Sequence, residues 1–111
     1  MNWYSEAESA LEAIAVLGDN WDGTGALATD PDKLHRAGLA LIKLSLHAEM
    51  PLIEPLRNGG VQLVWEEGDR YLEFSFDDEC GYLYEQKGIS DEGPIEDADD
   101  CVKLYKDFWH A

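Results

Sequence analysis

The chain has 111 residues, a length typical of one domain, so we expect a single domain spanning residues 1–111. Its 24 acidic and 8 basic side chains give a formal net charge of −16. A charge of this size repels nucleic acid and anionic membranes, which argues against direct binding to either. Hydrophobic residues make up 45% of the chain and include four Trp and five Tyr, which argues against a disordered acidic tail.

The sequence also carries signals about its compartment. No stretch approaches the roughly 20 apolar residues of a membrane span, and the first residues lack the basic and apolar regions of a secretion signal. We therefore expect a cytoplasmic protein. In that reducing compartment, Cys80 and Cys101 are expected to be buried thiols rather than a disulfide.

Two helices are predicted in the first half of the chain. The stretch from Ser5 to Glu8 reads as a capping box, and the apolar residues that follow it recur at helical spacing. The glycine-rich stretch Asn20–Ala26 predicts a tight connection. A second helix is predicted to begin at Asp30 and Pro31, where Asp caps the helix and Pro occupies its first position.

The second helix is apolar around most of its circumference. One stripe runs through Leu34, Ala37, Leu41, Leu44 and Ala48, and another through Leu39, Ile42 and Leu46. A helix of this kind is either covered on several sides or uses one stripe in a contact between subunits. We expect burial, and a homodimer through this helix is the alternative.

The second half of the chain predicts an antiparallel sheet. A short edge strand is expected at Leu52–Glu54, followed by strands at Val61–Glu66, Tyr71–Phe76 and Cys80–Gln86. A four-residue connection between the second and third of these pairs three apolar residues across the strands: Trp65 with Leu72, Leu63 with Phe74, and Val61 with Phe76. A two-residue turn at Glu67–Gly68 would shift these partners. The facing of Tyr82, Leu83 and Tyr84 stays open.

After Gly88, a polar loop over Ile89–Pro94 is expected to lead into a final amphipathic helix that covers the sheet. The predicted fold class is therefore α+β, an antiparallel β-meander of three to four strands packed on one side by helices. The expected order of elements is α-α-β-β-β-β-α.

Catalytic and metal-binding patterns are weak. His35 and His47 stand about three helical turns apart, too far to share one ion, and His110 lies beside the C-terminus. The oxygen-rich stretch at Asp19–Gly23 lacks the alternation of ligands that a calcium loop needs. We expect no catalytic residues, no metal, no cofactor and no enzymatic activity.

The acidic residues remain as candidates for function. Between Glu66 and Asp100 there are fourteen acids and only two bases. The predicted partner-binding residues are Glu66, Glu67, Asp69, Asp77, Asp78, Glu79, Asp91, Glu92, Glu96, Asp97, Asp99 and Asp100. Solvated acids that promote solubility are the simplest interpretation, but −16 exceeds the magnitude of roughly 2 to 8 that solubility asks of a small domain.

Two stretches resemble known sequences. Asn20-Trp21-Asp22-Gly23-Thr24-Gly25-Ala26, and Gly59–Glu66 with Tyr71–Phe74 after it, resemble a group of small, largely uncharacterised bacterial and phage proteins. These motifs are turns and strand faces, so the resemblance bears on the fold. In size and charge, the chain is also similar to acidic anti-CRISPR proteins and other inhibitors that mimic DNA.

These observations lead to one leading hypothesis and three others. The leading hypothesis is an inhibitor whose carboxylates occupy the basic groove of a CRISPR effector or another nucleic-acid-binding complex. The runner-up is an antitoxin or immunity protein that neutralises a basic toxin. A small enzyme with a carboxylate site at the sheet edge, and a dimeric adaptor that uses the second helix, are the other two.

Overall fold

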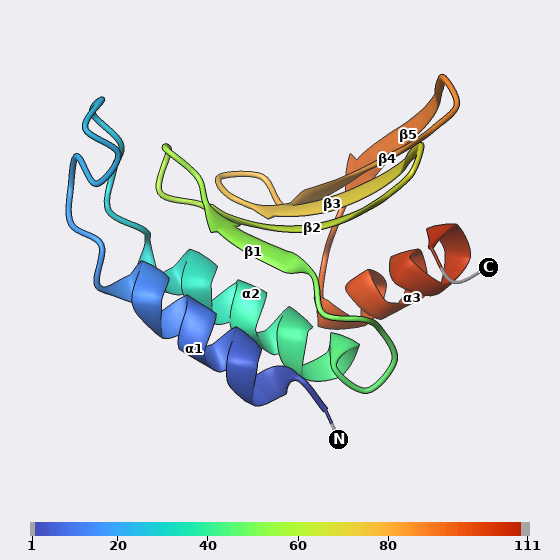
Figure 1. The fold of residues 1–111 in the computed structure, drawn as a ribbon, viewed down its shortest axis with the longest axis horizontal. Helices are drawn as coiled ribbons and strands as arrows, with labels where there is room; N and C mark the ends of the chain where they lie inside the picture. Colours follow the sequence, from blue (N-terminus) through green and yellow to red (C-terminus); the bar gives the residue numbers. More distant parts are fainter. Residues whose placement is uncertain (1, 110–111) are drawn as a thin grey trace.

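The computed structural model describes residues 2–109 and contains three helices and five strands in these residues (Figure 1). The elements, in chain order, are α1 (Tyr4–Ala15), α2 (Pro31–Leu44), β1 (Leu52–Pro55), β2 (Val61–Glu67), β3 (Arg70–Phe76), β4 (Gly81–Gln86), β5 (Ile89–Pro94) and α3 (Ala98–Phe108). The α+β class is confirmed. The predicted three to four strands are too few, because the described chain forms five.

The five strands form one antiparallel meander in the order β1-β2-β3-β4-β5. The predicted register between β2 and β3 is confirmed in all three apolar pairs. Glu67 and Arg70 also pair, so the turn consists of Gly68 and Asp69 alone, and Gly68 takes a positive φ of 60° that glycine adopts without strain. The alternative turn at Glu67–Gly68 is wrong.

The three helices lie together on one side of the sheet (Figure 1). The core between the two layers joins Leu41 and Leu44 of α2 to Leu63, Trp65 and the other inward residues of β2 and β3. At its centre, the Trp65 ring lies 5.2 Å from both the Phe74 ring and the Tyr105 ring, measured between centroids. Aromatic packing therefore joins α3 to the middle of the sheet.

The structure shows which side chains of β4 point toward the helices. Tyr82 and Tyr84 point to the helix side, where their rings lie 5.7 and 4.8 Å from the ring of Phe108. Leu83 consequently points to the opposite face. The reason is register: Tyr82 pairs with Phe74 and Tyr84 with Leu72, and both partners are buried against the helices.

The expected polar loop at Ile89–Pro94 is wrong, because these residues form the edge strand β5. Lys87 and Gly88 make the turn before it, both with positive φ, and β5 then pairs with β4 along its whole length. Strand-forming residues are scarce in Ile-Ser-Asp-Glu-Gly-Pro, so cross-strand pairing, rather than intrinsic propensity, places it in the sheet.

The predicted capping box at Ser5–Glu8 is also wrong. Helix α1 has Trp3 at its N-cap, with no side-chain cap, and Ser5 lies inside the first turn. The Trp3 indole N–H donates to the Ala48 carbonyl oxygen over 2.8 Å, which fixes the start of α1 against the segment that follows α2. The cap of α2 is confirmed, since the Asp30 carboxylate accepts from the Asp32 backbone N–H.

Both cysteines are free thiols. Cys101 is fully buried, and burial raises the pKa of its thiol to about 12. Cys80 is only half-buried, so the expectation of a buried thiol holds for Cys101 and in part for Cys80.

The first stretch that carries the resemblance, Asn20–Ala26, is bound to Arg57, which lies in the turn just before the second stretch. The Asp22 carboxylate accepts hydrogen bonds from the Thr24 hydroxyl, from the backbone N–H of Thr24 and Ala26, and from Arg57 Nε over 2.6 Å. The Arg57 guanidinium also donates to the Thr24 carbonyl oxygen. Asp22 therefore ties the loop before α2 to the β1–β2 turn.

Neutralising Asp22 should remove part of the acid sensitivity of the fold. The hydrogen bonds from Thr24, and then that from Arg57, hold the Asp22 pKa well below its ordinary value of 3.8. A carboxyl whose pKa falls on folding stabilises the protein above its ordinary pKa, and this stabilisation is lost as the pH drops. In urea unfolding, Asp22→Asn should lower stability at pH 6 and show a smaller further loss between pH 5 and pH 2 than the wild type. Asp69→Asn removes the same charge from an exposed turn, and an equal effect there would contradict the role of Asp22.

Removing the central aromatic ring of the sheet should be costly. Phe74 is fully buried, so Phe74→Ala should lower the free energy of unfolding by about 3–5 kcal/mol, through lost burial and the cavity left behind. Ile89→Ala is the matched control because Ile89 is 71% exposed, and its cost should stay within about 0.5 kcal/mol. Urea denaturation followed by tryptophan fluorescence measures both.

Candidate partner-binding surface

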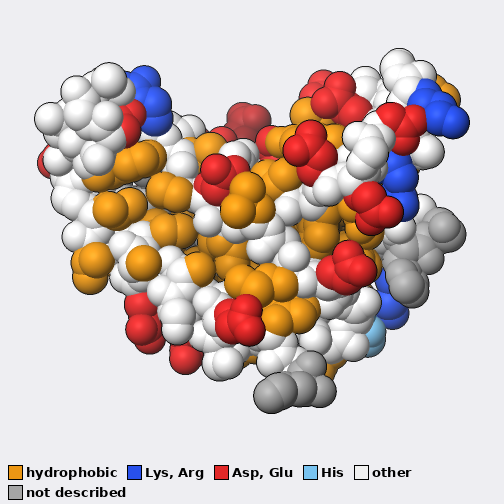
Figure 2. Space-filling view, in the orientation of Figure 1, with side chains coloured by type: hydrophobic (Ala, Val, Ile, Leu, Met, Phe, Trp, Pro, Cys, Tyr) orange, Lys and Arg blue, Asp and Glu red, His pale blue; other side chains and the backbone are white. Residues whose placement is uncertain are grey.

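The sheet has a second face that no helix covers among the described residues. Side chains alternate along each strand, so those between the buried residues of β2, β3 and β4 point away from the helices. The register of the five strands assigns this outer face to Leu52, Glu54, Gln62, Val64, Glu66, Tyr71, Glu73, Ser75, Leu83, Glu85, Ser90 and Glu92. The strands bend so that this outer face is concave (Figure 1), and the molecule is notched above it in the space-filling view (Figure 2).

The outer face carries acids without bases. Five of its residues are carboxylates, one from each strand: Glu54, Glu66, Glu73, Glu85 and Glu92. No Lys or Arg of residues 2–109 belongs to it. The eight bases lie on α2, on α3, in two turns and on the helix side of β3: Lys33, Arg36, Lys43, Arg57, Arg70, Lys87, Lys103 and Lys106.

Glu73 sits at the centre of the outer face and is held from both sides along its own strand. The Tyr71 hydroxyl donates to one carboxylate oxygen over 2.6 Å, and the Ser75 hydroxyl donates to the other over 2.9 Å. Burial raises the Tyr71 pKa, and so do this hydrogen bond and the charges of Glu73, Glu66 and Glu54. The Tyr71 hydroxyl is therefore held in its protonated form, which donates to Glu73.

The Glu54 carboxylate is also engaged on this face, since Gln62 Nε2 donates to it over 3.3 Å. Beside Glu73, a shallow open hollow of about 720 Å³ is lined in part by Glu73, Glu79, Leu83 and Glu92. Carboxylates around an apolar floor suit the long side chains of Lys and Arg, which have an apolar stem and a charged end.

The structure divides the twelve sequence-predicted acids among three places. Only Glu66 and Glu92 lie on the outer face. Seven lie at the two ends of the sheet: Glu67 and Asp69 at the β2–β3 turn, and Asp77, Asp78, Glu79, Glu96 and Asp97 where the β3–β4 turn meets the approach to α3. The seven residues of β3 separate these ends by roughly 23 Å.

The remaining three predicted acids face the helix side. Asp91 accepts from the Tyr82 hydroxyl over 3.3 Å, Asp100 accepts from the Glu96 backbone N–H over 2.8 Å, and Asp99 pairs with Lys43 over 2.7 Å. Two of the acids at the sheet end also serve the fold. Asp97 caps α3, and Asp78 pairs with Lys33 over 2.9 Å, which raises the Lys33 pKa.

Sequence reasoning missed Glu54, Glu73 and Glu85 as site residues. The alternation of β3 already places Glu73 opposite its apolar neighbours, so that signal was available. Glu85 required the facing of β4, which the sequence left open. Glu54 required the pairing of Glu54 with Gln62, which depends on the register of an edge strand only four residues long.

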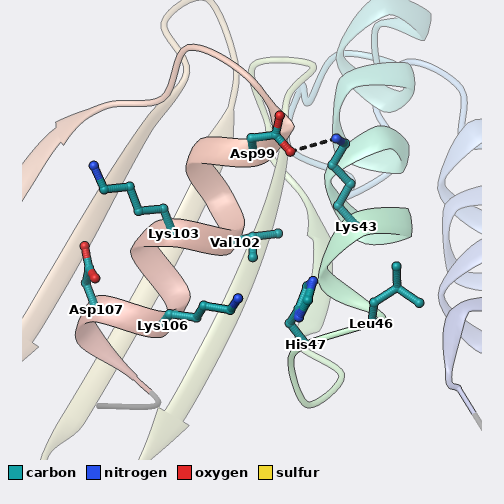
Figure 3. A pocket seen from close by; sticks show the side chains of 8 residues that line it. All are labelled: Lys43, Leu46, His47, Asp99, Val102, Lys103, Lys106 and Asp107. Carbon is teal, nitrogen blue, oxygen red and sulfur yellow. Dashed lines mark hydrogen bonds and ion pairs between the residues drawn. The ribbon is translucent and has the colours of Figure 1, made fainter.

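The opposite side of the molecule has a different character. A groove of about 460 Å³ between α2 and α3 is lined by Lys43, Leu46, His47, Asp99, Val102, Lys103, Lys106 and Asp107 (Figure 3). Lys106 reaches toward His47 and α2, and the Lys43–Asp99 pair bridges the two helices (Figure 3). The charges of this groove are mixed, in contrast to the outer face.

Comparison with protein-family models, with curated proteins and with solved structures finds no match. Within residues 2–109, no group of three or more His, Cys, Asp or Glu side chains is arranged to hold a metal ion, and His110 lies outside these residues. No helix in the same range is long and apolar enough to cross a membrane.

The hydrogen bond to Glu73 should be visible in a titration of the tyrosines. Because burial, and then Glu73, raise the Tyr71 pKa, the wild type should contain a tyrosine that ionises well above the ordinary value of 10.0. Glu73→Gln should lower the pKa of that tyrosine, and Tyr71→Phe should abolish its step in tyrosinate absorbance. Glu92→Gln, on the same face but outside the pair, is the control. A high-pH step unchanged in Tyr71→Phe would contradict the assignment.

Proposed function

We propose that the protein is an acidic binding protein that takes a cationic element of another protein against its outer face. The concave face with five carboxylates and no base carries this proposal. The further proposal is that the bound element belongs to a nucleic-acid-binding complex, such as a CRISPR effector, and that binding inhibits it.

The spacing of the carboxylates supports their joint action. The register makes Glu66 and Glu85 diagonal cross-strand neighbours of Glu73, a separation of about 7–8 Å. The Debye length at physiological ionic strength is about 8 Å, so neighbouring carboxylates on this face act together on a bound cation. The net charge of −16 adds a long-range field that speeds the approach of a basic partner and weakens with salt.

The absence of bases on the outer face argues against a role in solubility alone. Opposite charges on paired residues stabilise an exposed antiparallel face, and the register places all five carboxylates opposite uncharged residues. Here Glu54, Glu66, Glu73, Glu85 and Glu92 share the face with no ion pair among the described residues. A basic partner would supply the missing counter-charge.

The shape of the surface bears on the kind of partner. A DNA mimic that fills a groove needs a protruding acidic surface, whereas the outer face of this molecule is hollowed (Figure 2). The concave outer face instead fits a protruding basic helix or loop. This observation favours the second candidate function, an antitoxin or immunity protein that neutralises a basic toxin.

Two variants with the same change of net charge separate specific from bulk attraction. One replaces Glu54, Glu73, Glu85 and Glu92 by Gln on the outer face. The other changes Glu6, Glu8, Glu12 and Asp107 to the corresponding amides on the helices. With a lysine- and arginine-rich peptide as the probe in calorimetry, the outer-face variant should bind at least about tenfold more weakly, a loss of about 1.4 kcal/mol. The helix variant should lose less than about threefold in affinity. An equal loss of affinity in both variants would contradict the proposal.

The inhibitory role has a separate test. With a CRISPR effector complex as the probe, the wild type should reduce DNA loading in a gel-shift assay, whereas the outer-face variant should not. Binding to the complex with unchanged DNA loading would rule out inhibition by occupancy. Protection of cells from a basic toxin, without any effect on loading, would support the antitoxin role instead.

A further inference from the structure

Helix α2 exposes an apolar stripe on the side that faces away from the sheet. Leu39 is 45% exposed, Ile42 47% and Leu46, just past the helix end, 71%. At 100° per residue, these positions lie opposite the buried Ala37 and Leu44. The same helix is therefore apolar on its core side and on its solvent side, and only the core side is covered in the described chain.

A groove runs beside this stripe, between α1 and α2. It has a volume of about 350 Å³, and its lining includes Leu11 and Ala15 of α1 and Gly38 of α2. Gly38 has no side chain here, and a Cβ at this position would meet the Leu11 Cδ1 atom at 3.6 Å, an ordinary van der Waals distance. Leu39 and Ile42 of the stripe also line this groove, so an apolar ridge adjoins an apolar hollow, a shape that can receive a copy of itself.

Charge restricts where two copies with a net charge of −16 can meet. The stretch from Lys33 to Ala48 contains no acid, so the stripe on α2 can face its own copy without opposing carboxylates. The flanks differ in sign. On one side, α1 carries three Glu and no base; on the other, Lys43, His47, Lys103 and Lys106 line the groove with α3, together with two Asp (Figure 3).

We propose that a second copy of this chain covers the stripe of Leu39, Ile42 and Leu46, forming a twofold-symmetric dimer through the helix layer. A twofold axis along α2 places the α1 flank of each copy against the α3 flank of the other. The three Glu of α1 in one copy then meet a flank of its partner that holds three Lys and two Asp. An axis across α2 would set Glu against Glu, so charge favours the first arrangement.

The dimer leaves both outer faces free. The helix layers meet at the interface and the sheets lie on the outside, so the two concave acidic faces point in opposite directions. Such a dimer can hold two copies of a basic element, and it gains avidity where the partner presents more than one. The dimer does not depend on the function proposed for the outer face, and the two can fail independently.

The test is the mass in solution. The wild type should sediment at twice the chain mass at micromolar concentration, and Ile42→Glu should shift it to one chain, with a dissociation constant raised at least about tenfold. Ile89→Glu is the matched control, since Ile89 is 71% exposed on β5 and should leave the dimer intact. Circular dichroism and thermal unfolding of both variants confirm that they remain folded.

A cross-linking experiment tests the orientation. In a Cys80→Ser background, Leu39→Cys and Leu46→Cys should each form a disulfide between copies under mild oxidation, because an axis along α2 brings each position near its own copy. A disulfide that forms only when the two variants are mixed would overturn this arrangement. A wild type that stays monomeric at the highest soluble concentration would overturn the dimer and leave the stripe to a different protein.

Discussion

The strict alternation of side chains in β2, β3 and β4 is the constraint on which both sides of the molecule depend. It sends Trp65, Leu72 and Phe74 into one layer, where Trp65 also donates its indole N–H to the Glu49 carbonyl oxygen over 2.9 Å. The same alternation sends Glu66 and Glu73 to the opposite face. A slip of one residue in either strand would expose the aromatic core and bury carboxylates, so the register of the core also fixes the register of the acidic face.

Several of the eight basic side chains bind groups on the helix side or at the ends of the sheet, away from the outer face. Lys33 and Lys43 of α2 pair with Asp78 of the β3–β4 turn and Asp99 of α3, which ties the central helix to acids on two other elements. Arg70 lies 4.2 Å from the centre of the Trp109 ring and donates to the carbonyl oxygens of Phe108 and Trp109, at the end of α3. Ion pairs at the surface, such as those of Lys33 and Lys43, add about 0–1 kcal/mol each. The position of the basic side chains has a larger consequence than these energies, because it leaves the carboxylates of the outer face without a counter-charge.

Much of the fold could be predicted from the sequence, because the determining signals are local. Asp30 and Pro31 locate the start of α2, and the apolar alternation of β2 and β3 sets their register. The errors arose where longer-range contacts decide. Strand β5 forms from a polar sequence because β4 offers it a partner, and Trp3 takes the place expected for a side-chain cap through its bond to Ala48. The candidate surface was harder to predict, since linear clustering selected acids such as Asp99 and Asp100 that serve the fold, and it missed Glu85, whose position depends on the facing of β4.

The two exposed faces share a physical feature that links them. Each holds groups that lack a partner in the isolated domain. The outer face has five carboxylates with no base among them, and the helix layer exposes large apolar side chains at Leu39, Ile42 and Leu46. The two surfaces differ in what would stabilise them. A cationic surface would neutralise the carboxylates, and an apolar surface would cover the stripe on α2. Because the faces lie on opposite sides of a two-layer fold, both partners can bind at once (Figure 1). The alternation that builds the core therefore gathers the carboxylates on one uncovered face, and the pattern of α2 places an apolar stripe on the far side of the helix layer. These are the two surfaces for which a basic partner and a second copy are proposed.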